Sequence, residues 1–521
     1  MASVRSLDNA LLTGAGSPRP GFPITDNDGV TQIPTNGRLI RNLIEGADVV
    51  MSHLTHFYQL TALDFVDATN LGPFFNPSYT ANGTAMIAGT QGMPNGQSVV
   101  SNYVDSLVVR RWAHTMGGVL SGRQPIQNAI VSGGVTTVPN RSDMATFNQL
   151  LSNIRGFINT AYIPDVLTVA ATAPVTLGGV YTTYLQYWNT TGTLNTLSYG
   201  MFPCQTGTAA EQLLIARGVC LGTAFQAGTG AGPTALLNNI FEDTTYSYYN
   251  NTAQLLPPHQ GQTNPDVTKV GNGTQYTWLK APRYSTARTV CEVGPLARMV
   301  VSTFNSACIA KIATQTGASQ SSATFAGLPA LYSASDIVGA TLSAMVALTG
   351  GTLTTVNLFS TFGRHAARAI ECKLIADAMA TWSSQLSANG LTNSTYVYAK
   401  LPTKPAFGSG WTEAPRGALG HWITIEKKKI VNYQCVVPST WNHSPRDANN
   451  IKGPAETVIS QINVGTASSD QQVVNIIRAL HPFDFCIACA VHMVRPDGST
   501  IAKFKMDMDG KVTKLPHDAE I

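Results

Sequence analysis

The sequence has few charged residues, no strongly basic segment and no long apolar run, and each shortage excludes a class of protein. Only 12% of the 521 residues are charged, and the formal net charge is +4. There is no basic stripe of the kind that nucleic acid requires, so no nucleic-acid partner is expected. No apolar run approaches the roughly 18–20 residues of a membrane-spanning helix. The first residues also lack the pattern of a secretory signal. Composition alone therefore predicts a cytoplasmic protein.

Cysteine is scarce and mostly scattered, which argues against a disulfide framework. The eight cysteines are Cys204, Cys220, Cys291, Cys308, Cys372, Cys435, Cys486 and Cys489, and only the last two are close together. The other six are expected to be small buried hydrophobic residues. The hydrophobic content of 44% is ample for a large core, in one large domain or two closely packed ones.

The close pair, Cys486-x-x-Cys489, is followed by His492. Two cysteines at this spacing can direct both sulfurs at one metal, and thiolates favour soft transition metals such as nickel and iron. From the residues alone, half a zinc site, a redox dithiol and a structural pair remain open. A haem attachment motif is excluded, because Ala490 and Val491 separate the second cysteine from the histidine.

The apolar periodicity predicts long helices. Helices are expected at 2–12, 38–67, 295–313 and from about 363 to the Asn389-Gly390 stop signal. Their inward positions are Leu39, Leu43, Ala47, Val50, Leu54 and Phe57 in the second, Leu296, Val300, Phe304 and Cys308 in the third, and Ala367, Ile370, Leu374, Ala378 and Trp382 in the fourth. Helices of this length indicate a bundle core.

Shorter polar and β-forming stretches lie between these helices. Residues 76–96 and 169–199 are expected to be loops and short strands. Residues 421–437 are expected to form a hairpin around the triplet Lys427–Lys429, and 501–506 with 512–515 a second hairpin. The fold class expected is α+β and mainly helical, with a long-helix bundle core and peripheral short strands and loops.

Five segments, in this order, resemble the large subunits of nickel–iron hydrogenases. They are RNLIEGADVVMSHLTHFYQLTALDFVD from Arg41, APRY…EVGPLARMV from Ala281, GRHAARAIECKLIADAM from Gly363, EAPRGALGHWITIEKKKIVNYQCVVPSTWN from Glu413 and HPFDFCIACAVH from His481. The resemblance implies that family's fold, as a single large domain over 1–492 with a divergent peripheral region at 70–280. It also implies that 493–521 are a C-terminal maturation peptide removed by a dedicated endopeptidase. The alternative is a simple C-terminal hairpin.

The resemblance also implies a metal centre. Cys486 matches a terminal nickel ligand, and Cys489 matches a thiolate that bridges nickel to an iron carrying carbon monoxide and cyanide. His492 matches a magnesium ligand, and the backbone carbonyl of Cys435 is a weaker candidate for the same ion. The alternatives for Cys486 and Cys489 are a zinc half-site, and for His492 a surface histidine.

Four further residues match groups that surround the metals in the family. Arg416 matches an arginine proposed there as a general base or an electrostatic guide for hydrogen, and it follows Pro415. Asp484 matches the acid expected to pair with this arginine, because an unpaired buried arginine would be costly. Ser439 matches a hydroxyl that bonds a cyanide. The alternative for Arg416 is a structural salt bridge.

The sequence departs from the family pattern in three places. The family's other nickel box, Cys-x-x-Cys-x-x-x-His, is not found, so two of four thiolates are expected. A late start codon, a split gene and a true truncation would each explain this, and the chain alone is not expected to hold the bimetal centre. In addition, Ser52 replaces an acid in Met51-Ser52-His53, and Phe485 replaces a proline.

The expected activity is reversible oxidation of H2, with electrons passed to a partner. No cysteine set for an iron–sulfur cluster is present, so a separate iron–sulfur small subunit should carry the clusters. The resemblance implies a membrane cytochrome b as a further partner through that subunit. Co-export with the small subunit would give a periplasmic or membrane-associated location. The alternatives are a non-catalytic binding or assembly module, a quinone-facing subunit of a respiratory complex, which the paired cysteines argue against, and a zinc-binding structural protein.

Overall fold

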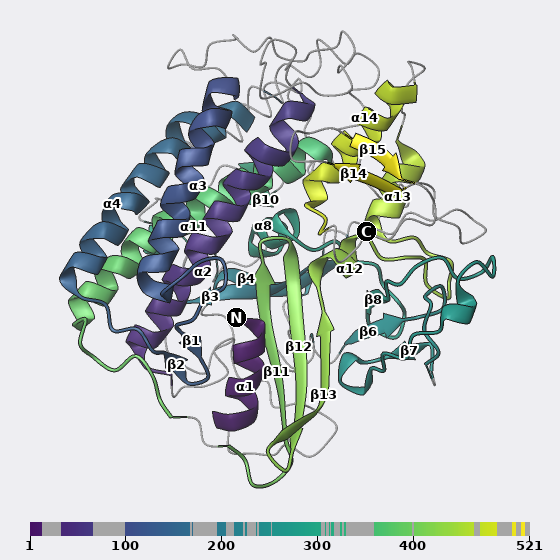
Figure 1. The fold of residues 1–521 in the computed structure, drawn as a ribbon, viewed down its shortest axis with the longest axis horizontal. Helices are drawn as coiled ribbons and strands as arrows, with labels where there is room; N and C mark the ends of the chain where they lie inside the picture. The colour runs from purple at the N-terminus through teal and green to yellow at the C-terminus, as the bar shows by residue number, and fades with distance from the viewer. Residues whose placement is uncertain are drawn as a thin grey trace.

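The protein is described by a computed structural model. The described residues are 1–12, 33–65, 99–166, 169, 195–204, 213–221, 224–226, 236, 239–251, 253–303, 308, 312, 314–316, 324–325, 328–329, 359–398, 401–462, 469–486, 503–506 and 512–515. Within them, long helices lie on one side of the molecule and the three-stranded sheet β11–β12–β13 stands beside them (Figure 1).

The helical side is built from α2 (Thr35–Thr55), α3 (Val99–Ser121), α4 (Arg141–Phe157) and α11 (Thr361–Asn389). Helix α2 packs against α3 and α11, and α4 packs against α3 and α11. Every inward position expected for the α2 and α11 segments is buried in one shared core. The predicted bundle is therefore confirmed, because apolar residues at helical spacing gather on one face and that face must be covered.

The ends of the helices follow local chemistry. Ser360 accepts a hydrogen bond from the Gly363 amide at the start of α11, and Gly390, with φ of 89°, follows its last residue. Asn140 and Asp143 form a reciprocal capping box at α4. Helix α2 continues directly into the π-helical segment η1 (His56–Thr61) and the 3₁₀ turn η2 (Ala62–Asp64). The predicted helix at 38–67 is thus present as far as Asp64, with a π-helical segment and a 3₁₀ turn as its last turns, and residues 66–67 lie outside the described residues.

Helix α1 (Ala2–Leu12) lies along strand β11 (Ala406–Ala414). Strand β12 (Gly417–Glu426) pairs antiparallel with β11 and with β13 (Lys429–Val436). Glycines allow the close approach of α1, because a Cβ on Gly408 would lie 2.1 Å from the Ser6 carbonyl oxygen. The predicted hairpin is confirmed, and β11 adds a third strand that the sequence analysis did not include.

Two smaller sheets and α8 (Pro295–Thr303) complete the fold. One contains β3 (Thr196–Pro203), β4 (Leu213–Leu221) and β5 (Ala224–Gln226), and the other β6 (Ile240–Asp243), β7 (Leu255–Leu256) and β8 (Ala281–Tyr284). Helix α8 packs on β3 and β4. Strands β3 and β4 are buried almost throughout, so the expectation of purely peripheral strands was wrong for them. They are covered on both sides, which period-2 patterning does not reveal.

Short elements make up the rest of the described chain. They are β1 (Ile130–Val131), β2 (Gly134–Val135), η3 (Ile158–Tyr162), η5 (Pro258–Gln260), η6 (Val267–Lys269), β9 (Thr324–Phe325), β10 (Leu328–Pro329), α12 (Pro438–Asn442), α13 (Pro454–Gln461), α14 (Ser469–Leu480), η8 (His481–Phe483), β14 (Lys503–Met506) and β15 (Val512–Leu515). Strands β14 and β15 pair antiparallel, as predicted for a hairpin in 501–515. No described helix is long and apolar enough to cross a membrane.

Candidate functional site

The turn between β11 and β12 positions Arg416, and the buried side chain of Arg298 holds this turn. Arg298 comes from α8 and donates hydrogen bonds to the carbonyl oxygens of Ala414 (2.9 Å) and Pro415 (3.0 Å). These are the two residues that precede Arg416. A planar guanidinium can serve several acceptors at once without losing its charge, so Arg298 fixes the backbone from which Arg416 projects.

Two glycines let the chain before α8 meet this turn. Gly417 has φ of 135°, and a Cβ there would lie 2.7 Å from the Gly294 nitrogen. Gly294 has φ of 116°, and its Cβ would lie 3.0 Å from the Arg416 carbonyl oxygen. Both positions combine positive φ with backbone contact, so each requires glycine. The contact fixes where the turn lies relative to α8.

Arg298 also links two buried carboxylates. Its guanidinium contacts Glu371 of α11 through Nη2 at 2.7 Å and Glu413 of β11 through Nη1 at 2.9 Å. His53 of α2 contacts the same Glu371 at 2.9 Å, and Glu413 accepts a hydrogen bond from the Tyr199 amide. All four ionisable side chains are almost completely buried. The network therefore ties α2, α8, α11 and β11 together beneath the turn.

Burial raises the pKa values of these two carboxyl groups, whereas the charge of Arg298 lowers them. Burial alone would raise the pKa of Glu371, but Arg298 and His53 lower it to about 2. For Glu413 burial dominates over Arg298 and raises the pKa to about 7. One arginine is shared by two carboxyls, so only the carboxyl with the second partner, His53, is fully compensated. Burial lowers the pKa of His53, which favours its neutral form.

Side chains from the helices hold the segment that leads to Cys486. Arg368 of α11 donates twice to the Pro482 carbonyl oxygen, both at 3.1 Å. His56 contacts the His481 carbonyl oxygen at 2.7 Å through Nε2, which must donate because a carbonyl only accepts. Arg364 lies over the Phe483 ring at 4.1 Å. This segment has little regular structure of its own, so these contacts determine its path.

Arg416 and Asp484 meet beside Cys486. Arg416 Nη2 lies 3.0 Å from Asp484 Oδ1, with 40% of the arginine side chain and 2% of the aspartate side chain exposed. Asp484 adopts the left-handed conformation, with φ of 55°. The pairing expected from the sequence is therefore present. Arg416 Nε and Asp484 Oδ2 are buried without a hydrogen-bond partner among the described residues. Each keeps a polar atom available to a further group.

Ser439 of α12 also belongs to this site. Its Oγ accepts a hydrogen bond of 3.1 Å from the Cys486 amide, and the Cys486 side chain is half-buried. Because the hydroxyl is the acceptor here, its own proton remains available to donate. Arg416, Ser439, Asp484 and Cys486, which lie far apart in the sequence, are thus brought together.

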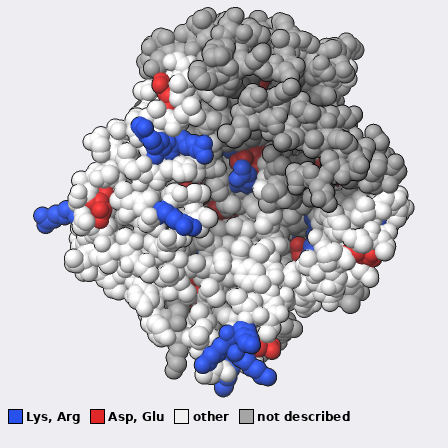
Figure 2. Space-filling model, in the orientation of Figure 1, with Lys and Arg blue, Asp and Glu red and all other residues white. Residues whose placement is uncertain are grey.

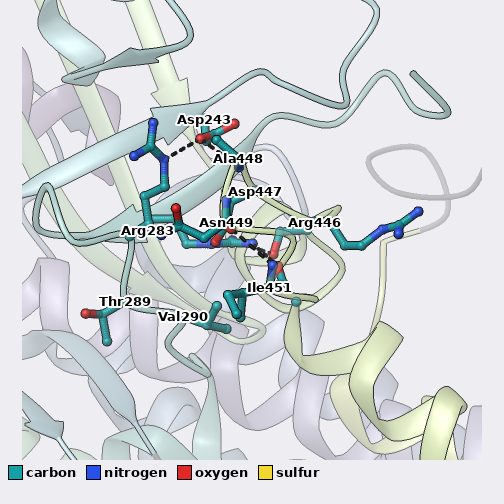
Figure 3. A network of polar contacts seen from close by, with 12 residues as sticks. Asp243, Arg283, Thr289, Val290, Arg446, Asp447, Ala448, Asn449 and Ile451 are labelled. Carbon is teal, nitrogen blue, oxygen red and sulfur yellow. Dashed lines mark hydrogen bonds and ion pairs between the residues drawn. The ribbon is translucent and has the colours of Figure 1, made fainter. Parts of the chain in front are cut away.

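The loop after α12 is anchored by a second buried arginine, Arg283 of β8 (Figure 3). Its Nε lies 2.7 Å from Asp447 Oδ2, and its Nη2 donates to the Pro445 carbonyl oxygen at 2.9 Å. Asp447 Oδ1 accepts hydrogen bonds from the Asn449 and Ile451 amides. The loop that follows Ser439 is therefore fixed on the β6–β7–β8 sheet, which stabilises α12 from its C-terminal side.

The remaining predicted residues divide into two groups. Cys489 and His492 lie outside the described residues. Cys435 lies on edge strand β13 opposite His421 and is exposed, so the expectation that it is buried was wrong, while Cys204, Cys220, Cys291, Cys308 and Cys372 are buried as expected. Within the described part of the chain, no group of three or more His, Cys, Asp or Glu side chains could hold a metal ion.

The two substituted positions have defined surroundings. The Phe485 ring lies 5.5 Å from the His443 ring, so an aromatic contact replaces the rigid proline expected there. Ser52 is half-buried, one residue before His53. Sequence reasoning did not single out Arg298, Arg368 and Glu371 as functional. A signal was present, because Arg364, Arg368 and Glu371 follow each other at steps of four and three and therefore lie on one face of the helix.

Comparisons with known proteins agree on one family. The model of the family described as nickel-dependent hydrogenase matches residues 25–87 and 69–492. The sequence is 30% identical to the quinone-reactive Ni/Fe-hydrogenase large chain of Wolinella succinogenes, over 94% of this chain and 86% of that protein. It is 31% identical to the periplasmic NiFeSe hydrogenase large subunit of Desulfomicrobium baculatum, over 89% and 80% respectively. A solved structure of the NiFeSe hydrogenase from Dm. baculatum superposes with a TM-score of 0.71 at 29% identity, over 94% of this chain and 86% of that one.

Proposed function

The chain belongs to the nickel-dependent hydrogenase family, and from this premise we propose that it is the catalytic large subunit of a hydrogenase that oxidises H2 reversibly at a nickel–iron centre. The observation that carries the proposal is the Arg416–Asp484 pair, whose Nη2 and Oδ1 atoms lie 3.0 Å apart. This pair lies beside Cys486, whose amide donates a hydrogen bond to Ser439. Neighbouring groups that come from three separate segments and keep unsatisfied polar atoms are typical of a site that receives a ligand.

Cys486 and Cys489 would hold the metals. Cys486 would be a terminal nickel ligand and Cys489 a bridge to an iron that carries carbon monoxide and cyanide. The described residues fit such a centre, because Cys486 is half-buried next to Arg416 Nε and Asp484 Oδ2, which lack hydrogen-bond partners among the described residues. Cys486-x-x-Cys489 is the only pair at this spacing in the sequence. When bound, the centre would supply the heterolytic cleavage of H2.

The residues around Cys486 would position charge and protons. The Arg416 guanidinium would direct its Nε–H toward the ligands of the iron, while Asp484 fixes the other end of the fork. Pro415 would keep the turn rigid, and its carbonyl oxygen is already held by Arg298. Ser439 would donate its hydroxyl proton to a cyanide nitrogen. The thiolate of Cys486, which lies beside the Arg416–Asp484 pair, would be a group able to hold a proton there.

A magnesium ion would stabilise the C-terminal side of the site. His492 would bind it through a ring nitrogen, and the Cys435 carbonyl oxygen is a weaker candidate ligand. His421, opposite Cys435, has its pKa lowered to about 4 by burial and so adds no positive charge near the ion at neutral pH. A carbonyl oxygen suits a hard cation such as magnesium, whereas the assignment of His492 rests on the family resemblance.

The chain would work with an iron–sulfur small subunit, which takes the electrons, and through it with a membrane cytochrome b. A periplasmic or membrane-associated location would follow from co-export with that subunit. The relatives include a large subunit named as periplasmic and a large chain named as quinone-reactive. Residues 493–521 would be removed by a maturation endopeptidase after metal insertion, although β14 and β15 within them form a hairpin.

The proposal is tested by expressing the chain from its native gene, together with its small subunit, in a host that has hydrogenase maturation proteins. Nickel content and H2-dependent viologen reduction would be measured for the wild type, Cys486→Ser and Cys435→Ser. We expect Cys486→Ser to lose nickel and activity. Cys435→Ser should retain both, because its side chain is exposed and only its carbonyl is assigned a role. A wild-type protein without nickel, or a fully active Cys486→Ser protein, would contradict the proposal.

A further inference from the structure

The far end of the β12–β13 hairpin exposes consecutive lysines in an unfavourable backbone conformation. Lys427 and Lys428 have φ of 49° and 63°, and Lys429 begins β13. All three side chains are exposed. Asparagine and glycine adopt these angles at lower cost, and they are the usual residues of a two-residue hairpin turn. Backbone strain of this kind is concentrated at functional sites.

A fourth lysine lies at the same end of the sheet. Ala406 pairs with Ile425, so Lys404, two residues before Ala406, belongs to the end of the sheet that carries the turn. Glu426 is the acid adjacent to the turn in the sequence. None of the four lysines forms an ion pair with another described residue. Figure 2 shows the resulting positive cluster at the tip of the molecule, below the sheet. Four cations thus face solvent, and Glu426, the cross-strand partner of Lys429, is the acid that lies beside them.

Two exposed aliphatic side chains follow the lysines directly. Ile430 is 60% exposed and Val431 is 54% exposed, both on edge strand β13. Burying these apolar groups would be favourable, but they are too few to form the core of a protein interface of roughly 800 Å² per partner. A nucleic-acid ligand would not account for these two exposed aliphatic side chains. Lysines beside aliphatic groups at a projecting tip fit a lipid surface, where ammonium groups contact phosphates and aliphatic groups enter the interfacial layer.

We propose that this lysine tip, formed by Lys404, Lys427, Lys428, Lys429, Ile430 and Val431, docks the protein on an anionic phospholipid surface. The ten residues of β12 separate the tip from the Arg416 turn by roughly 30 Å. Docking would therefore leave the Arg416–Asp484 pair uncovered. The inference is independent of the metal chemistry, because it rests on the other end of the strand.

The test is cosedimentation of the full chain with vesicles of phosphatidylcholine that contain roughly 30% phosphatidylglycerol. Vesicles of phosphatidylcholine alone serve as the comparison. We expect binding to the anionic vesicles that weakens as salt rises. Lys428→Gln/Lys429→Gln should weaken binding by about 25-fold, at about fivefold per lysine. The matched control, Arg110→Gln/Arg111→Gln on the exposed face of α3, removes the same charge elsewhere and should change binding less than about twofold.

A third variant separates lipid from an acidic protein. Ile430→Ser/Val431→Ser keeps every lysine and should still weaken vesicle binding about tenfold, because its aliphatic groups no longer enter the bilayer. The proposal would be overturned if the lysine double variant and the α3 double variant lost vesicle binding to the same extent. It would also be overturned if the wild type did not bind anionic vesicles. Binding to polyglutamate without binding to vesicles would also overturn it and would assign the lysines to an acidic protein.

Discussion

Strand β12 has a turn at each end, and the two turns are built in opposite ways. The turn at Arg416 uses a glycine at φ of 135°, lies against Gly294 and has its carbonyl oxygens held by Arg298. The turn at Lys427 and Lys428 uses lysines at positive φ and has no ion pair with a described residue. Contacts with neighbouring segments fix the first turn, whereas the second turn exposes its side chains to solvent. We therefore assign the rigid turn at Arg416 to the reaction and the exposed turn at Lys427 and Lys428 to docking on a lipid surface.

The largest expected effect comes from removing the residue that holds the first turn. Arg298→Met would leave Glu371 and Glu413 buried without their shared cation, so the free energy of unfolding should fall by about 3–5 kcal/mol. Chemical denaturation followed by circular dichroism measures it. The same substitution at the other turn, Lys428→Met, should change stability by less than about 0.5 kcal/mol. Equal effects at the two turns would remove the contrast between them.

The pH dependence of stability should also come from the first turn. The pKa of Glu413 is raised to about 7, so the folded state favours its protonated form. The contribution of this group to the free energy of unfolding is therefore complete below the unfolded pKa of 4.5 and is lost as pH rises through 7. Between pH 5 and 8 the wild type should lose roughly 2–3 kcal/mol from this group. Glu413→Gln should lose correspondingly less over the same range. Parallel pH profiles would show that Glu413 does not titrate there.

Backbone substitutions should have opposite signs at the two turns. Gly417→Ala forces a Cβ to within 2.7 Å of the Gly294 nitrogen and should cost about 2 kcal/mol. Lys427→Asn/Lys428→Gly relieves two left-handed lysines and should stabilise the protein by about 1 kcal/mol. Thermal unfolding of both variants under one condition gives the comparison. A stabilising Gly417→Ala, or a destabilising change at the lysines, would reverse the interpretation.

Local signals in the sequence were sufficient for much of the fold. The α11 segment was predicted because its apolar positions follow helical spacing and Gly390 ends it. The β12–β13 hairpin was predicted from two β-forming stretches around the lysine triplet. The Arg416–Asp484 pair followed from a resemblance in two separate segments, together with the cost of an unpaired buried arginine.

What the sequence did not reveal depends on contacts between distant segments. Strand β11 contains Gly408 and Gly410, which usually weaken a strand, and they are explained only by the close approach of α1. The role of Arg298 depends on partners 73 and 115 residues away. Neither a propensity nor a spacing encodes such contacts, because the partners become neighbours only after α8, α11 and β11 have packed together.

The most direct test of the central claim, that the Arg416–Asp484 pair acts in the reaction beside Cys486, is hydrogen oxidation by Arg416→Lys in the assembled enzyme. Lysine keeps the charge but loses the planar fork and the free Nε–H. The account predicts unchanged nickel content and unchanged thermal stability, with the rate of H2-dependent viologen reduction lowered at least about hundredfold. A rate within about twofold of the wild type, at full nickel content, would contradict it.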